Sequence, residues 1–248
     1  MAGHSHWAGI KHKKALVDAK RGKLWSKLAK AIIIAAKGGG DPDSNFRLRA
    51  AIDEAKAISL PKENIVRAIK TGTGELKGGD LEEIVYEGYG ADGVAVLCEI
   101  TTDNRNRTAP EIRKIFEVSG GKLGATGCVS WNFERKGTFL VALDAADEEK
   151  LMELVLEAGA DDFEKTGDGF EIVCHPDFYQ TVSNALRDAK IEPEVSQLTL
   201  IPKDSVEIKD VDTAAKVLKL IEQLDDHEDV QKVSSNYSIP DEIMEQLG

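Results

Sequence analysis

The chain has 248 residues, a net charge of −12 and 42% hydrophobic residues, so it is long enough for two or three domains with real cores. This composition excludes a disordered chain, and the lack of any run of about 18 apolar residues excludes a membrane-spanning helix. The basic N-terminus has no apolar signal core behind it, so we expect a cytoplasmic rather than a secreted protein.

Charge is sorted along the chain. Residues 1–40 carry nine Lys or Arg against one acid, Asp18, which gives them +8 and leaves −20 for the rest. A surface charged only for solubility has no reason to be sorted in this way. Lysine and arginine gain free energy by displacing counterions from phosphates, while acids elsewhere repel the wrong approach. We therefore interpret the first segment as a nucleic-acid-binding element.

The leading segment, residues 1–14, is small, broken by glycines, aromatic and basic. Such an arm can follow a backbone groove, with Trp7 or a histidine stacked on an exposed base and lysines on the phosphates. A basic terminus without a partner is the alternative, and a metal site is disfavoured because the three histidines lack a fourth ligand. The candidate contacts in this arm are His4, His6, Trp7, Lys11, His12, Lys13 and Lys14.

The first predicted helix covers about residues 15–36, where apolar residues recur at helical spacing. Four lysines at i, i+3, i+7 and i+10 fall within an arc of roughly 80°, largely opposite Leu28 and Ile32. One face can therefore pack while the other presents ammonium groups to phosphates. The candidate contacts on this helix are Lys20, Arg21, Lys23, Lys27 and Lys30.

Two more helices are predicted before residue 78. Three glycines and a proline within residues 38–42 end the first helix, because none of them continues a helix cheaply. A second helix follows Ser44, and Pro61 suits the first turn of a third helix that stops at Gly72. The glycines after that helix are typical of an interdomain linker.

From Tyr86 onward the periodicity becomes that of mixed helices and strands. We predict a strand at 94–100, a helix at 109–118 opened by a Thr-x-x-Glu capping box at Thr108, and a strand at 129–133. Residues 137–201 then follow the β-α-β-β-α-β order of a ferredoxin-like domain. The elements predicted from there on are strands 138–143, 160–165, 170–174 and 194–201, helices 147–158 and 177–189, a short strand near Val206, a helix at 211–224 and a strand at 229–236.

The expected fold is therefore multidomain, α and α+β. A basic helical nucleic-acid-binding domain occupies residues 1–78, and residues 79–134 with 203–248 form a discontinuous α+β domain. A ferredoxin-like α+β domain at 135–202 is inserted in it. Sequential domains are the alternative, but they would leave a small C-terminal sheet with poor burial.

A second anion-binding candidate lies in the Thr-Thr-Asp-Asn-Arg-Asn-Arg-Thr stretch at 101–108. Arg105 and Arg107 come just before a predicted helix N-terminus, where free N–H groups and the helix dipole favour an anion. Guanidinium groups add bidentate donors that match phosphate. The alternative is structural, with Asp103 and the capping box satisfying both arginines.

Catalytic motifs are missing from the sequence: there is no G-x-S-x-G, no H-E-x-x-H and no C-x-x-C. The glycine-rich stretch 120–127 lacks phosphate-loop spacing and is predicted to be a flexible connection. Cys98, Cys128 and Cys174 sit in strand-like stretches, as buried reduced thiols do. We therefore expect no enzyme, no cofactor, no metal site and no small-molecule substrate.

Six long and unusual stretches point to one known family. They are AGHSHWAGIKHKKALVDAKRGKLWSKL, GGGDPDSNFRLRAAIDEAK, PKENIVRAIKTGTG, YEGYGADGVAVL, TTDNRNRTAPEIRKIF and GCVSWNFERKG. With them the chain resembles the YebC/PmpR family over essentially its whole length, most strongly over residues 2–135. The resemblance implies a helical first domain and two α+β domains, the third inserted in the second, in a non-enzymatic cytoplasmic protein.

The family leaves two functions open. Members are commonly called probable transcriptional regulators that bind DNA. Others, including the mitochondrial translational activator of cytochrome oxidase subunit I, act on translation at the ribosome and help with proline-rich stretches. We expect the second role, because a thin basic arm with His and Trp suits irregular ribosomal RNA better than a duplex groove.

DNA binding remains the alternative, with the helix at 15–36 in a major groove. No helix-turn-helix spacing supports it, and lysine-rich faces contact phosphates rather than bases. An enzyme that uses Arg105 and Arg107 on a phosphorylated small molecule ranks last, because no nucleophile or general base accompanies them. The sequence implies no membrane partner and leaves the oligomeric state open, with a monomer favoured.

Overall fold

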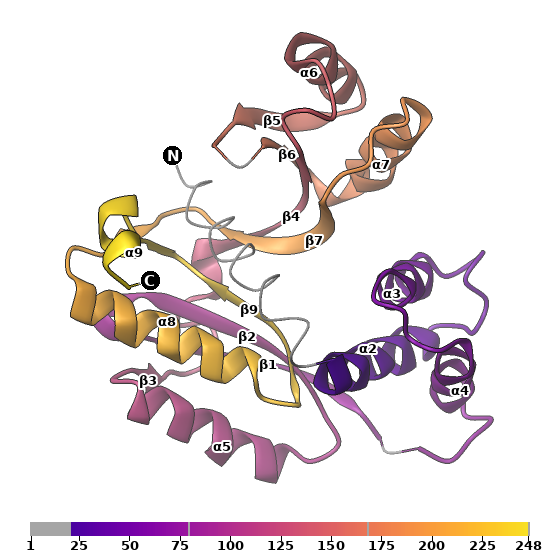
Figure 1. The fold of residues 1–248 in the computed structure, drawn as a ribbon. Helices are drawn as coiled ribbons and strands as arrows, with labels where there is room; N and C mark the ends of the chain where they lie inside the picture. Colours follow the sequence, from indigo (N-terminus) through magenta and orange to yellow (C-terminus); the bar gives the residue numbers. More distant parts are fainter. Residues whose placement is uncertain (1–20, 79, 168, 248) are drawn as a thin grey trace. The chain divides into compact units, whose positions relative to one another are not determined.

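The computed structural model describes residues 21–78, 80–167 and 169–247 (Figure 1). It divides into two compact units. The ferredoxin-like unit comprises Trp131–Glu207 with Asn236–Ser238, and the larger unit comprises the other described residues. The chain thus leaves the larger unit after Ser130 and re-enters it at Ile208. The division into three domains stays a prediction. Among the described residues, no helix is long and apolar enough to span a membrane.

Three helices open the larger unit, as the sequence predicts. They are α2 (Arg21–Ala36), α3 (Phe46–Ala57) and α4 (Lys62–Gly72). Residues 15–20 of the first predicted helix lie outside the described residues. The helices enclose a common apolar core, in line with the helical spacing of the sequence. Its fully or largely buried members include Leu28, Ile32, Leu48, Ile52, Ala55, Ile65 and Ala68.

The breaks between these helices have clear local causes. Asn45 is the N-cap of α3, and its Oδ1 accepts from the Leu48 N–H at 3.1 Å. Its Nδ2 donates to the carbonyls of Ala35 and Gly39, both at 2.8 Å, and so satisfies free acceptors at the end of α2. At the crossing of α4 over α2, a Cβ on Gly72 would collide with the carbonyl oxygen of Ile33. That glycine is therefore required by close packing.

A four-stranded antiparallel sheet forms the rest of the larger unit. Its strand order is β3-β1-β2-β9, and α5 and α8 lie side by side along one face (Figure 1). Gly88 and Gly90 of that face allow the approach of Phe116 from α5 and Leu220 from α8. The bounds are β1 Glu82–Tyr89, β2 Ala95–Thr102, α5 Arg105–Val118, β3 Lys122–Leu123, α8 Val211–Asp225, β9 Val230–Ser235 and α9 Asp241–Leu247.

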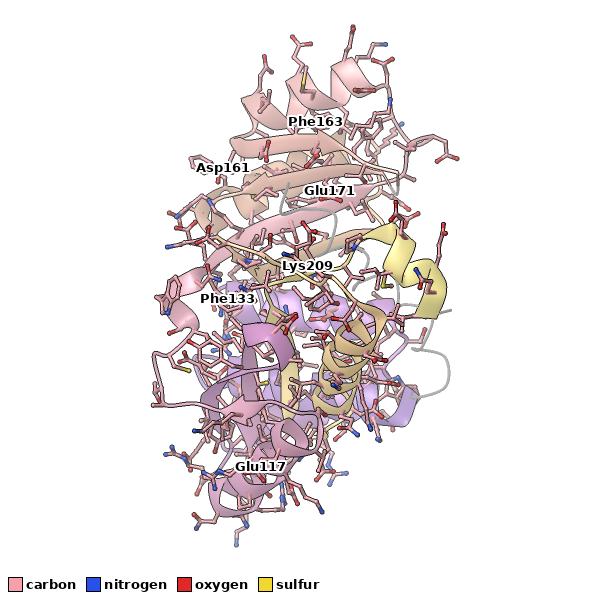
Figure 2. All side chains as sticks on the ribbon, turned by 90° about the vertical axis from the view of Figure 1, so that its left-hand side faces the viewer. Glu117, Phe133, Asp161, Phe163, Glu171 and Lys209 are labelled. Atoms are coloured by element: carbon pink, nitrogen blue, oxygen red, sulfur yellow. The ribbon has the colours of Figure 1, made fainter. Side chains whose placement is uncertain are left out.

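The ferredoxin-like unit has the predicted β-α-β-β-α-β order. Its antiparallel sheet has the order β5-β6-β4-β7, with a core that includes Phe139, Ile172 and Val182. Figure 2 labels Phe163 of β5, whose ring stacks on Phe170 of β6. The bounds are β4 Phe133–Val141, α6 Glu148–Glu157, β5 Ala160–Lys165, β6 Phe170–Cys174, α7 Tyr179–Asp188, β7 Val195–Pro202, β8 Val206–Glu207 and β10 Tyr237–Ser238.

The three cysteines are reduced thiols, as expected. Cys98 and Cys174 are buried, and Cys128 is half-buried. Burial raises the pKa of the Cys174 thiol to about 11, so this side chain is a neutral packing group at physiological pH.

The predicted capping box at Thr108 is wrong. The helix α5 begins at Arg105, one turn earlier, because the Asn104 side chain accepts from the Arg107 N–H at 3.1 Å and caps it there. Thr108 lies inside the helix and is fully buried, with its hydroxyl 3.0 Å from the Asn104 carbonyl oxygen. Asn and Thr are both good N-cap residues, so the sequence alone does not choose between Asn104 and Thr108. The tertiary contacts of Thr108 make Asn104 the cap.

The strand predicted at 129–133 is also wrong. Residues Ser130–Asn132 form a 3-10 turn, and β4 begins only at Phe133. The stretch predicted to be a flexible connection, 120–127, contains β3, which pairs with β1. Strand β1 itself, β10 and α9 have no counterpart in the sequence-based prediction.

Glu87 explains why the chain turns where a strand was expected. Its buried carboxylate accepts three backbone N–H groups: those of Gly127 at 2.7 Å and of Val129 and Ser130 at 2.8 Å each. N–H groups that point at one carboxylate cannot enter a strand ladder. Burial raises the pKa of Glu87, but the hydrogen bonds outweigh it and hold the pKa below its usual value.

We expect Glu87→Gln to destabilise the fold by about 2–3 kcal/mol, because an amide NH2 would face a backbone donor that needs an acceptor. Denaturant unfolding at neutral pH measures the loss. The carboxylate's contribution is present above the unfolded-state pKa of about 4.3 and is lost as pH falls through the lower folded-state pKa. Glu117→Gln, at an exposed position, is the control. Equal stability of the two variants would contradict the assignment.

Candidate nucleic-acid interface

The structure describes only part of the predicted interface. Arg21 opens α2, but its side chain is not described. Five predicted contacts have described side chains: Lys23, Lys27 and Lys30 on α2, and Arg105 and Arg107 on α5. The predicted contacts outside the described residues are His4, His6, Trp7, Lys11, His12, Lys13, Lys14 and Lys20.

Lys23, Lys27 and Lys30, here called the lysine row, face the turn that joins α8 to β9. This turn, residues 225–229, holds four acids and one histidine and is here called the acidic turn. Each of the three lysines bonds an oxygen of the acidic turn. Lys23 Nζ lies 3.4 Å from the carbonyl oxygen of Asp226 and 3.9 Å from Oδ2 of the same residue. Lys27 Nζ donates to the carbonyl of Asp225. Lys30 Nζ lies 3.1 Å from the carbonyl oxygen of Glu228 and 2.6 Å from Asp229 Oδ1.

The end of α8 accounts for this attraction. The last carbonyls of a helix have no partner within it, and the helix dipole adds negative potential there. The last turn of α8 holds no basic residue of its own. The lysine row therefore supplies the cations from α2, and the carboxylates that follow in the acidic turn increase the same negative potential.

Asp229 is the centre of the contact. Its side chain is fully buried, and its carboxylate bonds Lys30 at 2.6 Å, Arg107 and Thr108 at 2.8 Å each, and Thr102 at 3.2 Å. Burial raises the pKa of Asp229, but bonds from the two cations and the hydroxyls hold that pKa well below its usual range. One carboxylate thereby joins α2, α5 and β2.

The two arginines have different surroundings, both in the first turn of α5 rather than before it. Arg107 bonds the buried carboxylate of Asp229 and lies 3.3 Å from Asp103, as the structural alternative foresaw for Asp103. Arg105 is exposed, with Nη1 3.8 Å from Glu82 on β1. The structure therefore brings Arg107 together with Lys30, through a shared acid.

His227 holds the acidic turn in place. Its Nδ1 accepts from the Asp229 N–H at 3.2 Å, so Nε2 carries the proton and donates to Glu111 on α5 at 3.1 Å. The sequence analysis assigned no role to His227 or Asp229, because neither residue belongs to a motif with a known function. The available signal was the density of four acids in five residues directly after a predicted helix end.

Comparison with family models decides the family. The model of the TACO1/YebC protein N-terminal domain matches residues 5–75, and that of the TACO1/YebC second and third domain matches residues 81–237. The chain belongs to the TACO1/YebC family. The resemblance drawn from its sequence motifs is thereby confirmed.

Relatives of the TACO1/YebC family match along the full chain. A probable transcriptional regulatory protein of Rhodopirellula baltica, RB5500, is 57% identical over 98% of both chains, and one of Natranaerobius thermophilus is 53% identical over 99% of both. Among solved structures, that of the conserved hypothetical protein Aq1575 from Aquifex aeolicus superposes with a TM-score of 0.85 at 49% identity. The superposition covers 95% of this chain and 98% of that one. This chain therefore shares its mixed α and α+β fold with a solved structure that is 49% identical to it.

We expect Asp229→Asn to cost about 3–5 kcal/mol, because it leaves two cations beside a buried amide. The variant should also lose part of the wild type's acid sensitivity. The folded-state pKa of Asp229 is depressed, so its contribution is present above the unfolded-state pKa of about 3.9 and is lost as pH falls below it. Denaturant titrations from neutral pH to about pH 3 test both effects. An unchanged acid profile would contradict the role of Asp229.

Substitution of the two arginines should change the stability of the protein by different amounts. Arg107→Ala should lower the melting temperature clearly, because it removes a donor from a buried carboxylate. Arg105→Ala should change stability by less than about 0.5 kcal/mol, because its ion pair is long and exposed. Equal effects of the two substitutions would show that Arg107 has no special structural role.

Proposed function

We propose that this protein is a non-enzymatic, cytoplasmic regulator of gene expression that binds ribosomal RNA at the ribosome and eases the synthesis of proline-rich stretches. The observation that carries the proposal is the sorting of charge, +8 in residues 1–40 against −20 in the rest. The names of the relatives, probable transcriptional regulatory proteins, support a nucleic-acid partner and regulation of gene expression.

The state of the lysine row supports RNA over DNA as that partner. A recognition helix in a major groove would need the ammonium groups of α2 on phosphates. Here those groups are bonded to the acidic turn, and Lys27 is buried. The first contacts would then fall to the arm at 1–14 and Lys20. An arm with Trp7 and three histidines suits unstacked bases of irregular RNA.

DNA-binding transcriptional regulation is the second candidate. It is favoured by the printed names of the relatives, which speak of transcription rather than translation. An enzyme is the least supported reading of the chain. Arg107, in the first turn of α5, is bound to Asp229 and Asp103 rather than directed to a substrate.

The test is a binding measurement with the arm present and absent. We expect deletion of residues 1–14 to weaken binding of ribosomal RNA fragments at least tenfold while the melting temperature stays constant. For the full chain, the slope of log K against log salt should be roughly −3, since four lysines outside the row each release about 0.7 counterions on a single strand. Unchanged affinity after deletion, or an affinity that does not depend on salt, would contradict the proposal.

A further inference from the structure

We propose that the acidic turn competes with nucleic acid for the lysine row, so that a phosphate backbone reaches α2 only by displacing residues 225–229. The inference rests on the proposed function, because it concerns the regulation of that same basic surface. In the absence of nucleic acid, the acidic turn then binds the lysine row in place of phosphates.

The match of charge and spacing is the first support. The lysine row offers three ammonium groups about one helical turn apart, roughly 6 Å and 4.5 Å along the axis. The acidic turn meets them with a succession of carbonyl and carboxylate oxygens. A phosphate backbone likewise offers lysines a row of acceptor oxygens, with a negative charge on each phosphate. The acidic turn occupies donors of these ammonium groups and places negative charge beside them, so a phosphate must displace the turn to take its place.

The contact is graded along α2. At one end, Lys23 and Asp226 form a long, solvent-exposed ion pair of 3.9 Å, a kind of pair that is weak and screened by salt. At the other end, Lys30 bonds the buried carboxylate of Asp229 at 2.6 Å. An incoming polyanion therefore meets the weak end first and can replace the contacts in sequence toward Lys30.

The acidic turn keeps its structure when the lysines leave. Asp229 retains Arg107, Thr108 and Thr102 as donors, and His227 retains Glu111. The buried carboxylate is then still paired, so release of the lysine row does not leave an uncompensated buried charge. Displacement is thus a separation of two preformed surfaces and requires no unfolding.

Glu228 adds repulsion beyond the direct contacts. Its carboxylate is largely exposed and lies 3.9 Å from Arg107, while its carbonyl accepts from Lys30. This charge raises the negative potential beside the lysine row and acts against an approaching phosphate. Together with Asp226 it can be neutralised without touching the buried centre of the contact.

The experiment compares two double variants of the full chain. Asp226→Asn with Glu228→Gln weakens the competitor. The control, Asp212→Asn with Glu117→Gln, removes the same charge at exposed positions at the other ends of α8 and α5. Figure 2 labels Glu117. The probe is a fluorescent single-stranded RNA of about 20 nucleotides. We expect the turn variant to bind it about three- to tenfold more tightly than the control, with a steeper salt slope.

Lys23→Gln in each background tests whether the gain runs through the lysine row. It should change the affinity little in the wild type and weaken binding about threefold in the turn variant. A turn variant that binds no more tightly than the control, or a Lys23→Gln effect that is equal in both backgrounds, would overturn the inference while leaving the proposed function intact. If none of these proteins binds the RNA, both fail.

Discussion

The buried carboxylate of Asp229 is the interaction on which the larger unit depends. A charge taken out of water is costly unless donors surround it, and here two cations and two hydroxyls do so. Satisfying that charge fixes α2, α5 and β2 around one point. It also fixes the turn that carries it, and so brings the acidic turn onto the lysine row. The electrostatics of this region follow from that one burial.

The sequence predicts most of the fold because its local signals agree with one another. Apolar spacing, Pro61 and the glycines before and after the helices mark α2, α3 and α4, and alternation marks the ferredoxin-like order. It fails where a tertiary contact overrides a local one. Thr108 could cap a helix but bonds Asp229 instead, and Glu87 prevents the strand that was predicted at 129–133.

The sequence predicts which residue types form the candidate interface, but not which residues contact one another. The sequence shows that lysines cluster near one end and acids elsewhere, but Lys30 and Asp229 are 199 residues apart and nothing local indicates that they meet. The same charge sorting therefore has two consequences in one molecule. It makes the arm basic, and it lets the chain's own acids hold the neighbouring lysines. A basic surface in the sequence is not automatically an accessible one in the fold.

The proposed function requires that the basic N-terminal segment bring this protein to ribosomal RNA. The most direct measurement is ultraviolet crosslinking in the native cells, followed by sequencing of the bound nucleic acid, for the full chain and for a chain that lacks residues 1–14. We expect discrete peaks in large-subunit ribosomal RNA that disappear with the deletion. Enrichment of promoter DNA without a ribosomal signal would contradict it and favour a transcriptional regulator.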